Sequence, residues 1–322
     1  MCVSWRIQML GLLLGATLGA CDGGQTQCTR DPDCPQGQGC AAGRCVPVLK
    51  TDTGVSDHAA PRDGLREVAL PDHAIDQRRT DGGLTCKGNN DDKIERSEMP
   101  IAVGGKITYM RGSGITVNLK GTVVGGRTVW DLSGAAADDA KFIGELLATP
   151  SWASSVFPSA TYVSLLDQQY ESYGVFKATQ TALQILGIIS LTPDDTKITY
   201  DKPADMLRFP IVVGDSFEST AYSNGHLGSL VISNDETYTG DVLAAGDLKV
   251  PQLTLPVLLV RVKLYQCPAY PVCNPFNPFN TTRWTFLFVS ECYGIVGRVV
   301  TESDPSKDLT AVVAKERLRI SM

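Results

Sequence analysis

A long gap in the aromatic residues limits where this chain can build a hydrophobic core. After Trp5, no Phe, Trp or Tyr occurs until Tyr109. Aromatic side chains supply much of the buried area of a core, and a segment that lacks them cannot offset its conformational entropy by burial. We therefore expect one packed domain in residues 101–322 and little packing in the first third of the chain.

Residues 46–85 have the composition of a disordered linker. Seven acidic and five basic residues are mixed there with Pro, Gly and Ala. A flexible coil of this length averages on the order of 35 Å from end to end. We expect this segment to form a disordered stalk in front of the packed domain.

The first residues have the pattern of an export signal. Arg6 is the only charged side chain before an apolar run over residues 7–18, and that run is too short to span a bilayer comfortably. The run ends in Leu-Gly-Ala-Cys at residues 18–21. This motif resembles the lipobox of bacterial lipoproteins.

The resemblance implies a membrane-anchored protein. Residues 1–20 are then a signal peptide, Cys21 carries diacylglycerol and a fatty acid such as palmitate, and residues 21–27 form the tether. Two or three acyl chains give stable anchoring, where one chain does not. The expected location is the cell envelope, facing the periplasm or the cell exterior. The alternative is an ordinary cleaved signal with a chance cysteine.

The ten cysteines indicate an oxidising compartment. Without Cys2 and Cys21, eight remain, and an even remainder favours disulfide bonds. The predicted disulfide cysteines are Cys28, Cys34, Cys40, Cys45, Cys86, Cys267, Cys273 and Cys292. Their connectivity stays open: Cys292 can close onto Cys267 or Cys273, and Cys86 is expected to hold its loop at the edge of the domain.

Residues 28–45 form a disulfide-rich mini-module. Its four cysteines are separated by five, five and four residues, with Gly, Pro and Asp between them. The alternative, a zinc site, needs closely spaced cysteine pairs. The pattern Asp-x-Asp-Cys-Pro-x-Gly-x-x-Cys resembles short modules of exported myxobacterial proteins. That resemblance implies a spacer or interaction module without chemistry of its own.

Residues 86–100 resemble a degenerate EF-hand loop, the 12-residue calcium site of helix–loop–helix proteins. Lys87 stands where a carboxylate is expected, and Asp92 replaces the glycine of the sharp turn. The alternative is a polar turn that caps a short helix through Asp91 or Asp92. The predicted ligands of a weak Ca²⁺ site are Asn89, Asp91, Lys93 through its carbonyl, and Glu98.

From residue 101 onward, short β-branched runs alternate with glycine turns. This pattern predicts a mainly β domain, an antiparallel sandwich or an open barrel with one or two short helices. Residues 138–147 are the best helix candidate. The expected strands are 106–110, 115–124, 127–132, 161–166, 173–181, 183–191, 197–200, 206–213, 216–222, 227–233, 236–242, 257–266, 284–290, 295–301 and 309–320.

One stretch of the predicted domain resembles exported bacterial proteins of unknown function. The similar segments are residues 207–217, 246–251 and 257–263, in which a Phe-Pro strand and a Gly-Asp-Ser turn precede a hairpin. The resemblance implies a β-rich exported domain and provides no catalytic residue. Gln252 to Pro256 suggest a longer hairpin tip than is usual in that pattern.

The sequence offers little for catalysis. His58 and His73 lie in the linker, and His226 is expected in a turn between strands. Gly214-Asp-Ser216 superficially resembles an esterase nucleophile, but no histidine follows residue 226 to act as its base. We therefore expect no enzyme, with a carboxylate-based hydrolase as an alternative.

The loop after Cys267 is either a binding tip or a lid on the sheet. The proline-stiffened loop after Cys267 and the start of the next strand carry four aromatic residues. In the alternative, these rings fold back as a lid on the sheet. The candidate tip residues are Tyr270, Phe276, Phe279 and Trp284.

Charge limits the partners of the domain. A net charge of −6 and a pI near 5.2 argue against nucleic acid. We expect a monomeric lipoprotein that acts as a non-enzymatic binding or structural module. Its partners are the membrane, through the anchor, and an unknown protein, glycan or apolar ligand. A further alternative is a carrier of an apolar ligand or lipid in an open β-barrel.

Overall fold

The computed structural model describes residues 38–41, 44–47, 86, 88–167, 171–192, 195–269, 273–274, 276–305 and 308–321. The chain divides into two units, residues 1–75 and 76–322. In the first unit, β1 (Gln38–Ala41) and β2 (Arg44–Pro47) form an antiparallel hairpin in which Cys40 lies opposite Cys45. The predicted signal peptide, the lipid site Cys21, Cys28 and Cys34 lie outside the described residues.

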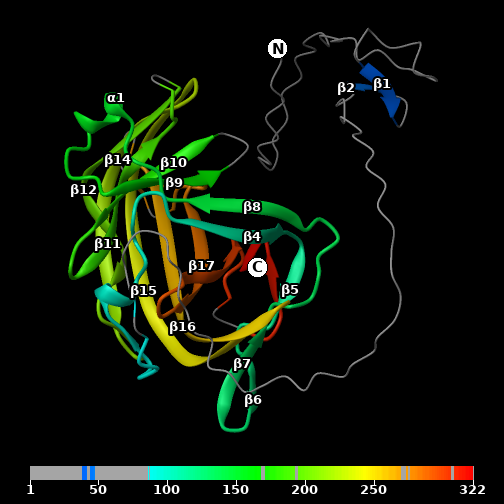
Figure 1. Cartoon of the computed structure of the whole chain (residues 1–322). Helices are drawn as coiled ribbons and strands as arrows, with labels where there is room; N and C mark the ends of the chain where they lie inside the picture. Colours follow the sequence, from blue (N-terminus) through cyan, green and yellow to red (C-terminus); the bar gives the residue numbers. More distant parts are fainter. Residues whose placement is uncertain are drawn as a thin grey trace. The chain divides into compact units, whose positions relative to one another are not determined.

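The second unit is mainly β, as predicted, with 61% of residues in strands and one α-helix among those described. Twelve antiparallel strands form one barrel-like sheet (Figure 1). In sheet order they are β8 (Ala140–Glu145), β4 (Lys106–Gly112), β20 (Glu316–Ile320), β18 (Gly294–Thr301), β17 (Thr281–Ser290), β16 (Leu253–Pro268), β15 (Leu230–Val250), β14 (Ser216–Leu227), β12 (Thr196–Arg208), β11 (Ala182–Ile189), β10 (Ser172–Ala178) and β9 (Tyr162–Asp167).

Most neighbours in this sheet are also neighbours in sequence, so short turns join them. There are exceptions: β4 pairs with β8 across a long segment, and β20 pairs with β4 and joins the two ends of the domain. The outer strands β8 and β9 then approach each other. Leu147 N donates to Val163 O at 2.8 Å and Val163 N to Leu147 O at 2.9 Å, which nearly closes the sheet. Closure removes the free edges through which β-proteins associate.

Shorter elements pack onto this sheet. β7 runs parallel to β15 and forms with β6 a hairpin that extends away from the sheet (Figure 1). The shorter elements are β3 (Lys93–Ile94) with β13 (Ile211–Val212), β5 (Ile115–Val117) with β19 (Val312–Ala314), β6 (Thr122–Val124) with β7 (Arg127–Asp131), the helix α1 (Ser151–Ser154) and a 3₁₀ turn (Arg96–Glu98).

Strand alternation places hydrophobic cores on both faces of the sheet. Along β16, Leu258 and Val260 belong to one core, while Val257 and Leu259 belong to the other. Successive side chains of a strand point to opposite faces, so a strand buried on both sides reads as a continuous apolar run. The second core is covered by β5, β7 and β19, with Trp130 against Phe288 at a ring distance of 5.6 Å.

The predicted helix at residues 138–147 is wrong. The segment forms β8, which pairs with β4 along its whole length. Phe142 is buried against Tyr109, while its neighbours Lys141 and Ile143 are exposed. This period-two burial is that of a strand, and a helix of ten residues containing Gly144 has little stability of its own.

Two predicted turns are also placed differently. His226 lies inside β14, paired with Lys197 and Val231, and the turn of the β14–β15 hairpin follows it at Gly228, whose φ is +57°. The predicted strand 227–233 therefore crosses this turn. The next hairpin has a two-residue turn, Pro251 and Gln252, because Val250 already pairs with Leu253. The longer tip expected there is absent.

Candidate functional site

The exposed aromatic loop after β16 is the candidate binding site. Cys267 and Cys273 form a disulfide at its base. The sequence then repeats Asn-Pro-Phe twice, at residues 274–276 and 277–279. Asn274 Oδ1 accepts from Phe276 N, and Asn277 Oδ1 accepts from Phe279 N, each at 3.0 Å. Such side-chain turns fix the backbone locally.

The second repeat is tied back to the first. Asn280 Nδ2 donates to Asn274 O at 2.9 Å, and Asn277 N donates to the same oxygen at 2.9 Å. The disulfide and these hydrogen bonds within the loop therefore constrain it without a bound partner. The asparagines were not among the predicted site residues, although the tandem Asn-Pro-Phe repeat was a visible signal for them.

The structure separates the predicted tip residues. Phe276 is 92% exposed and Phe279 is 53% exposed, so these rings do not fold back onto the sheet. Trp284 is only 8% exposed and belongs to the second core, with Arg261 and Lys263 over its ring at 5.5 and 5.2 Å. Trp284 is therefore not part of the exposed tip, and Tyr270 lies outside the described residues.

The β14–β15 hairpin lies beside the aromatic loop. Ala269 N donates to Ser233 O at 2.9 Å, which holds the loop beside that hairpin. Val231 near the hairpin turn is 78% exposed. We call Phe276 and Phe279 the apolar tip.

The first half of the calcium-like loop is bonded to a glutamate of the turn between β17 and β18. Asn89 N and Asn90 N donate to Glu291 Oε2 at 2.6 and 3.0 Å, so the backbone there faces a carboxylate. Asn89 and Asp91 bond to each other and to nearby amides. Among the described residues, no group of three or more His, Cys, Asp or Glu side chains suits a metal ion. The calcium site stays a prediction.

Glu98, the last predicted ligand, caps the 3₁₀ turn. It is 7% exposed, and its Oε2 accepts from Glu95 N at 2.8 Å. Glu95 is thus the cap residue, in place of the expected Asp91 or Asp92. Lys93 pairs with Glu95 at the surface.

A disulfide fastens this loop to the domain edge, as expected for Cys86. Its partner is Cys292, in the turn between β17 and β18, so the closure of Cys292 onto Cys267 or Cys273 is wrong. Cys292 N also donates to Glu98 O at 2.8 Å. Disulfides persist in oxidising compartments, and both of these are consistent with a protein outside the cytoplasm.

The Gly-Asp-Ser motif lines a small pocket. The cavity, about 210 Å³, lies between residues 207–211, residues 215–217, Val242 and Val260. Asp215 and Ser216 are exposed at its edge, and its lining contains no histidine. Ligand sites are typically 300–1,000 Å³, so this pocket is too small for a lipid carrier.

A buried carboxylate that sequence reasoning missed lies between four neighbouring strands. Glu236 on β15 is 3% exposed, and four side chains donate to it. The donors are Tyr238 Oη (2.7 Å), Tyr200 Oη (3.0 Å), Ser223 Oγ (2.7 Å) and Gln266 Nε2 (3.0 Å). A carboxylate with this many donors is satisfied and holds the strands together.

Burial raises the pKa of several tyrosines. The pKa of Tyr109 rises to about 12, and those of Tyr162, Tyr200 and Tyr238 also rise, in each case chiefly because burial disfavours the phenolate. For Tyr200 and Tyr238 the nearby charge of Glu236 raises the pKa further.

These pKa shifts predict unfolding at alkaline pH. The unfolded chain ionises its tyrosines near pH 10. The stability that the buried, protonated tyrosines contribute is therefore fully present below pH 10, and it is lost as the pH rises through 10 toward 12 and above. Phenolate absorbance, followed together with circular dichroism, should show buried tyrosines ionising only as the domain unfolds. Tyr109→Phe should raise the midpoint of this transition. Ionisation of all ten tyrosines near pH 10 in the folded state would contradict the prediction.

No protein-family model, no curated protein and no solved structure matches this chain. No described helix is long and apolar enough to cross a bilayer. The β-barrel-like fold is compatible with a binding or structural module.

Proposed function

We propose that this protein is an envelope-anchored, non-enzymatic binding module that contacts an extracytoplasmic protein through the apolar tip. The observation that carries this proposal is the 92% exposure of Phe276 on a loop that a disulfide and side-chain turns constrain. Exposed apolar side chains that lie together mark interaction sites, and Phe276 and Phe279 are three residues apart on this loop. Little entropy is lost when a preorganised loop binds.

The chemistry of the tip favours a protein pocket as the partner. Phenylalanine provides contact area but no hydrogen-bonding group, unlike Tyr or Trp. Anchor residues of protein interfaces are apolar or aromatic side chains that enter a desolvated pocket. Lipid attachment at Cys21 and the linker over residues 46–85 would present the domain to such a partner at a distance from the membrane.

Site-specific photo-crosslinking tests this proposal. A photoreactive residue is placed at position 276 of the full-length chain in intact cells, and Val123 at the tip of the β6–β7 hairpin, which is 72% exposed, is the control position. We expect a discrete crosslinked protein from position 276 and not from position 123. Phe279→Ala should reduce the product about tenfold, the effect of losing one interface anchor. Identical products from both positions would contradict the proposal.

A further inference from the structure

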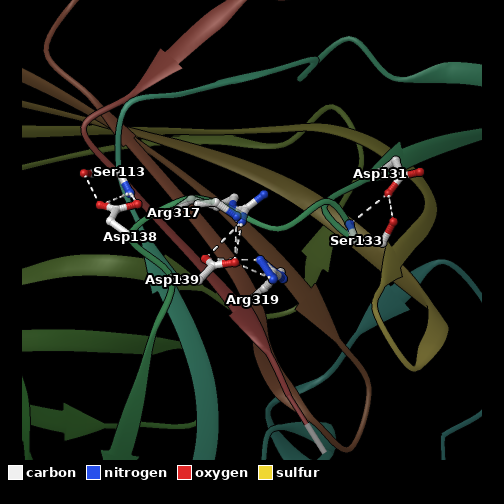
Figure 2. A network of polar contacts seen from close by, with 8 residues as sticks. Ser113, Asp131, Ser133, Asp138, Asp139, Arg317 and Arg319 are labelled. Carbon is white, nitrogen blue, oxygen red and sulfur yellow. Dashed lines mark hydrogen bonds and ion pairs between the residues drawn. The ribbon is translucent and has the colours of Figure 1, made fainter.

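Two buried arginines on β20 share one carboxylate (Figure 2). Arg317 and Arg319 are each 3% exposed, and their side chains lie on the same face of the strand because they are two residues apart. Arg319 Nη1 and Nη2 donate to Asp139 Oδ1 and Oδ2 at 3.4 and 2.8 Å. Arg317 Nη2 donates to the same two oxygens at 3.2 and 3.5 Å. One negative charge therefore faces two positive charges.

The neighbouring carboxylates that the structure describes do not neutralise the second positive charge of Arg317 and Arg319 by direct contact. Asp138 is exposed and is bonded to Ser113, through the backbone N at 3.0 Å and Oγ at 2.5 Å. On the other face of β20, Glu316 already pairs with both Arg111 and Arg298. Each face of the strand thus carries two guanidinium groups for one carboxylate in contact.

Donor atoms of the two arginines are also left unpaired. The Nε atoms of Arg317 and Arg319 are buried and have no hydrogen-bond partner in the described part of the chain. A buried donor of a charged group without an acceptor is costly, and so is an uncompensated buried charge. A bound anion would satisfy the donors and the charge together.

The cluster is shaped by its neighbours and lies close to solvent. A Cβ at Gly112 would lie 2.7 Å from Asp139 Oδ1, so the glycine leaves room for the carboxylate. Asp139 ends the segment 133–139, which lies outside the strands and contains mostly exposed residues. Ala136 N donates to Asp139 Oδ2 at 2.8 Å and fixes the carboxylate to this segment. The partner of the two arginines therefore comes from a surface loop.

We propose that Arg317 and Arg319 bind a tetrahedral oxyanion, with Asp139 as the internal competitor for the same donors. The planar guanidinium fork suits carboxylates and phosphates. Asp139 already occupies the planar carboxylate position at Arg319. A phosphate presents oxygens in more than one plane, so it can accept from donors that a planar carboxylate leaves unpaired. The ligand is inorganic phosphate or the phosphate group of a small molecule.

Calorimetric titration of the full-length chain with inorganic phosphate tests the proposal, with chloride at equal ionic strength as the screening control. We expect saturable binding to the wild type that is lost in Arg317→Gln. Asp139→Asn should bind about tenfold more tightly, because it removes the competing carboxylate. Glycerol 3-phosphate forms a second arm: binding of both ligands assigns the site to phosphate esters, and binding of phosphate alone assigns it to the free anion.

Two further measurements separate binding from a structural role. Arg261→Gln removes an arginine from a balanced pair with Asp241 and should leave phosphate binding unchanged. Phosphate should raise the melting temperature of the wild type and of Asp139→Asn, but not that of Arg317→Lys, which keeps the charge and loses the fork. Absence of saturable heat in both the wild type and Asp139→Asn would overturn the site. Equal phosphate stabilisation of every variant would also overturn it.

Discussion

Replacing Cys86 and Cys292 together by serine is expected to lower the free energy of unfolding by about 5 kcal/mol. The two cysteines are 206 residues apart in sequence. In the chain-entropy account, a cross-link stabilises mainly by restricting the unfolded chain, and its effect grows with the length of the closed loop. This disulfide closes nearly the whole second unit. Urea unfolding of the oxidised wild type and the double variant measures the difference.

The second disulfide provides the matched control. Cys267 and Cys273 are only six residues apart, so Cys267→Ser with Cys273→Ser should cost about 2 kcal/mol. The Cys86 disulfide also holds native contacts at the domain edge, among them the bond from Cys292 N to Glu98 O. Equal losses in the two double variants would contradict the chain-entropy explanation, and so would a loss below about 1 kcal/mol in the first.

The features that local patterns encode were predictable from the sequence. The two-residue alternation and glycine turns predicted an antiparallel β domain, and most of the sheet is a meander of neighbours in sequence. The segments 173–181 and 183–191 correspond to β10 and β11. The loop after Cys267 was expected either as a lid on the sheet or as an exposed tip, and the exposure of Phe276 and Phe279 agrees with the tip.

The misplaced elements depend on distant pairing. Residues 197–213 were expected as two strands separated near Pro203, but β12 runs continuously from Thr196 to Arg208. Its register with β11 shifts around this proline, and a bulge is the place where a strand tolerates a residue without an N–H. The strand β8 exists because β4 pairs with it, and local helix propensity in 138–147 could not indicate that partner.

The candidate sites differ in the same way, since one lies in a local stretch of sequence and the others depend on distant pairing. The tip is one continuous stretch of sequence, and composition was enough to find it. The Arg317, Arg319 and Asp139 cluster joins residues about 180 positions apart, and it forms only when β20 pairs with β4. The hydrogen-bond donors to Glu236 come from β12, β14, β15 and β16. No local pattern marks such residues before the strand order is known.

Removal of the Glu236 carboxylate is expected to be the second most destabilising change. Glu236→Ala leaves four donors without their acceptor, from the buried Tyr238 and Ser223 and the half-buried Tyr200 and Gln266. Each unsatisfied buried group costs roughly 1–3 kcal/mol. Part of this is recovered because the hydroxyls of Tyr200 and Tyr238, which lie 2.9 Å apart, can bond to each other once the carboxylate is gone. We expect a loss of about 4 kcal/mol in the free energy of unfolding at neutral pH, measured in urea.

The conservative variant separates the hydrogen bonds from the charge. Glu236→Gln keeps one carbonyl acceptor, and the tyrosine hydroxyls can rotate to accept from the new amide, so it should cost only about 1–2 kcal/mol. It should also lower the pKa of Tyr200 and Tyr238, because the charge of Glu236 raises both. Glu218→Ala on the exposed face of β14 is the control and should change stability by less than about 0.5 kcal/mol. If Glu236→Ala is as mild as Glu218→Ala, the four donors find other acceptors and the carboxylate does not hold the strands together.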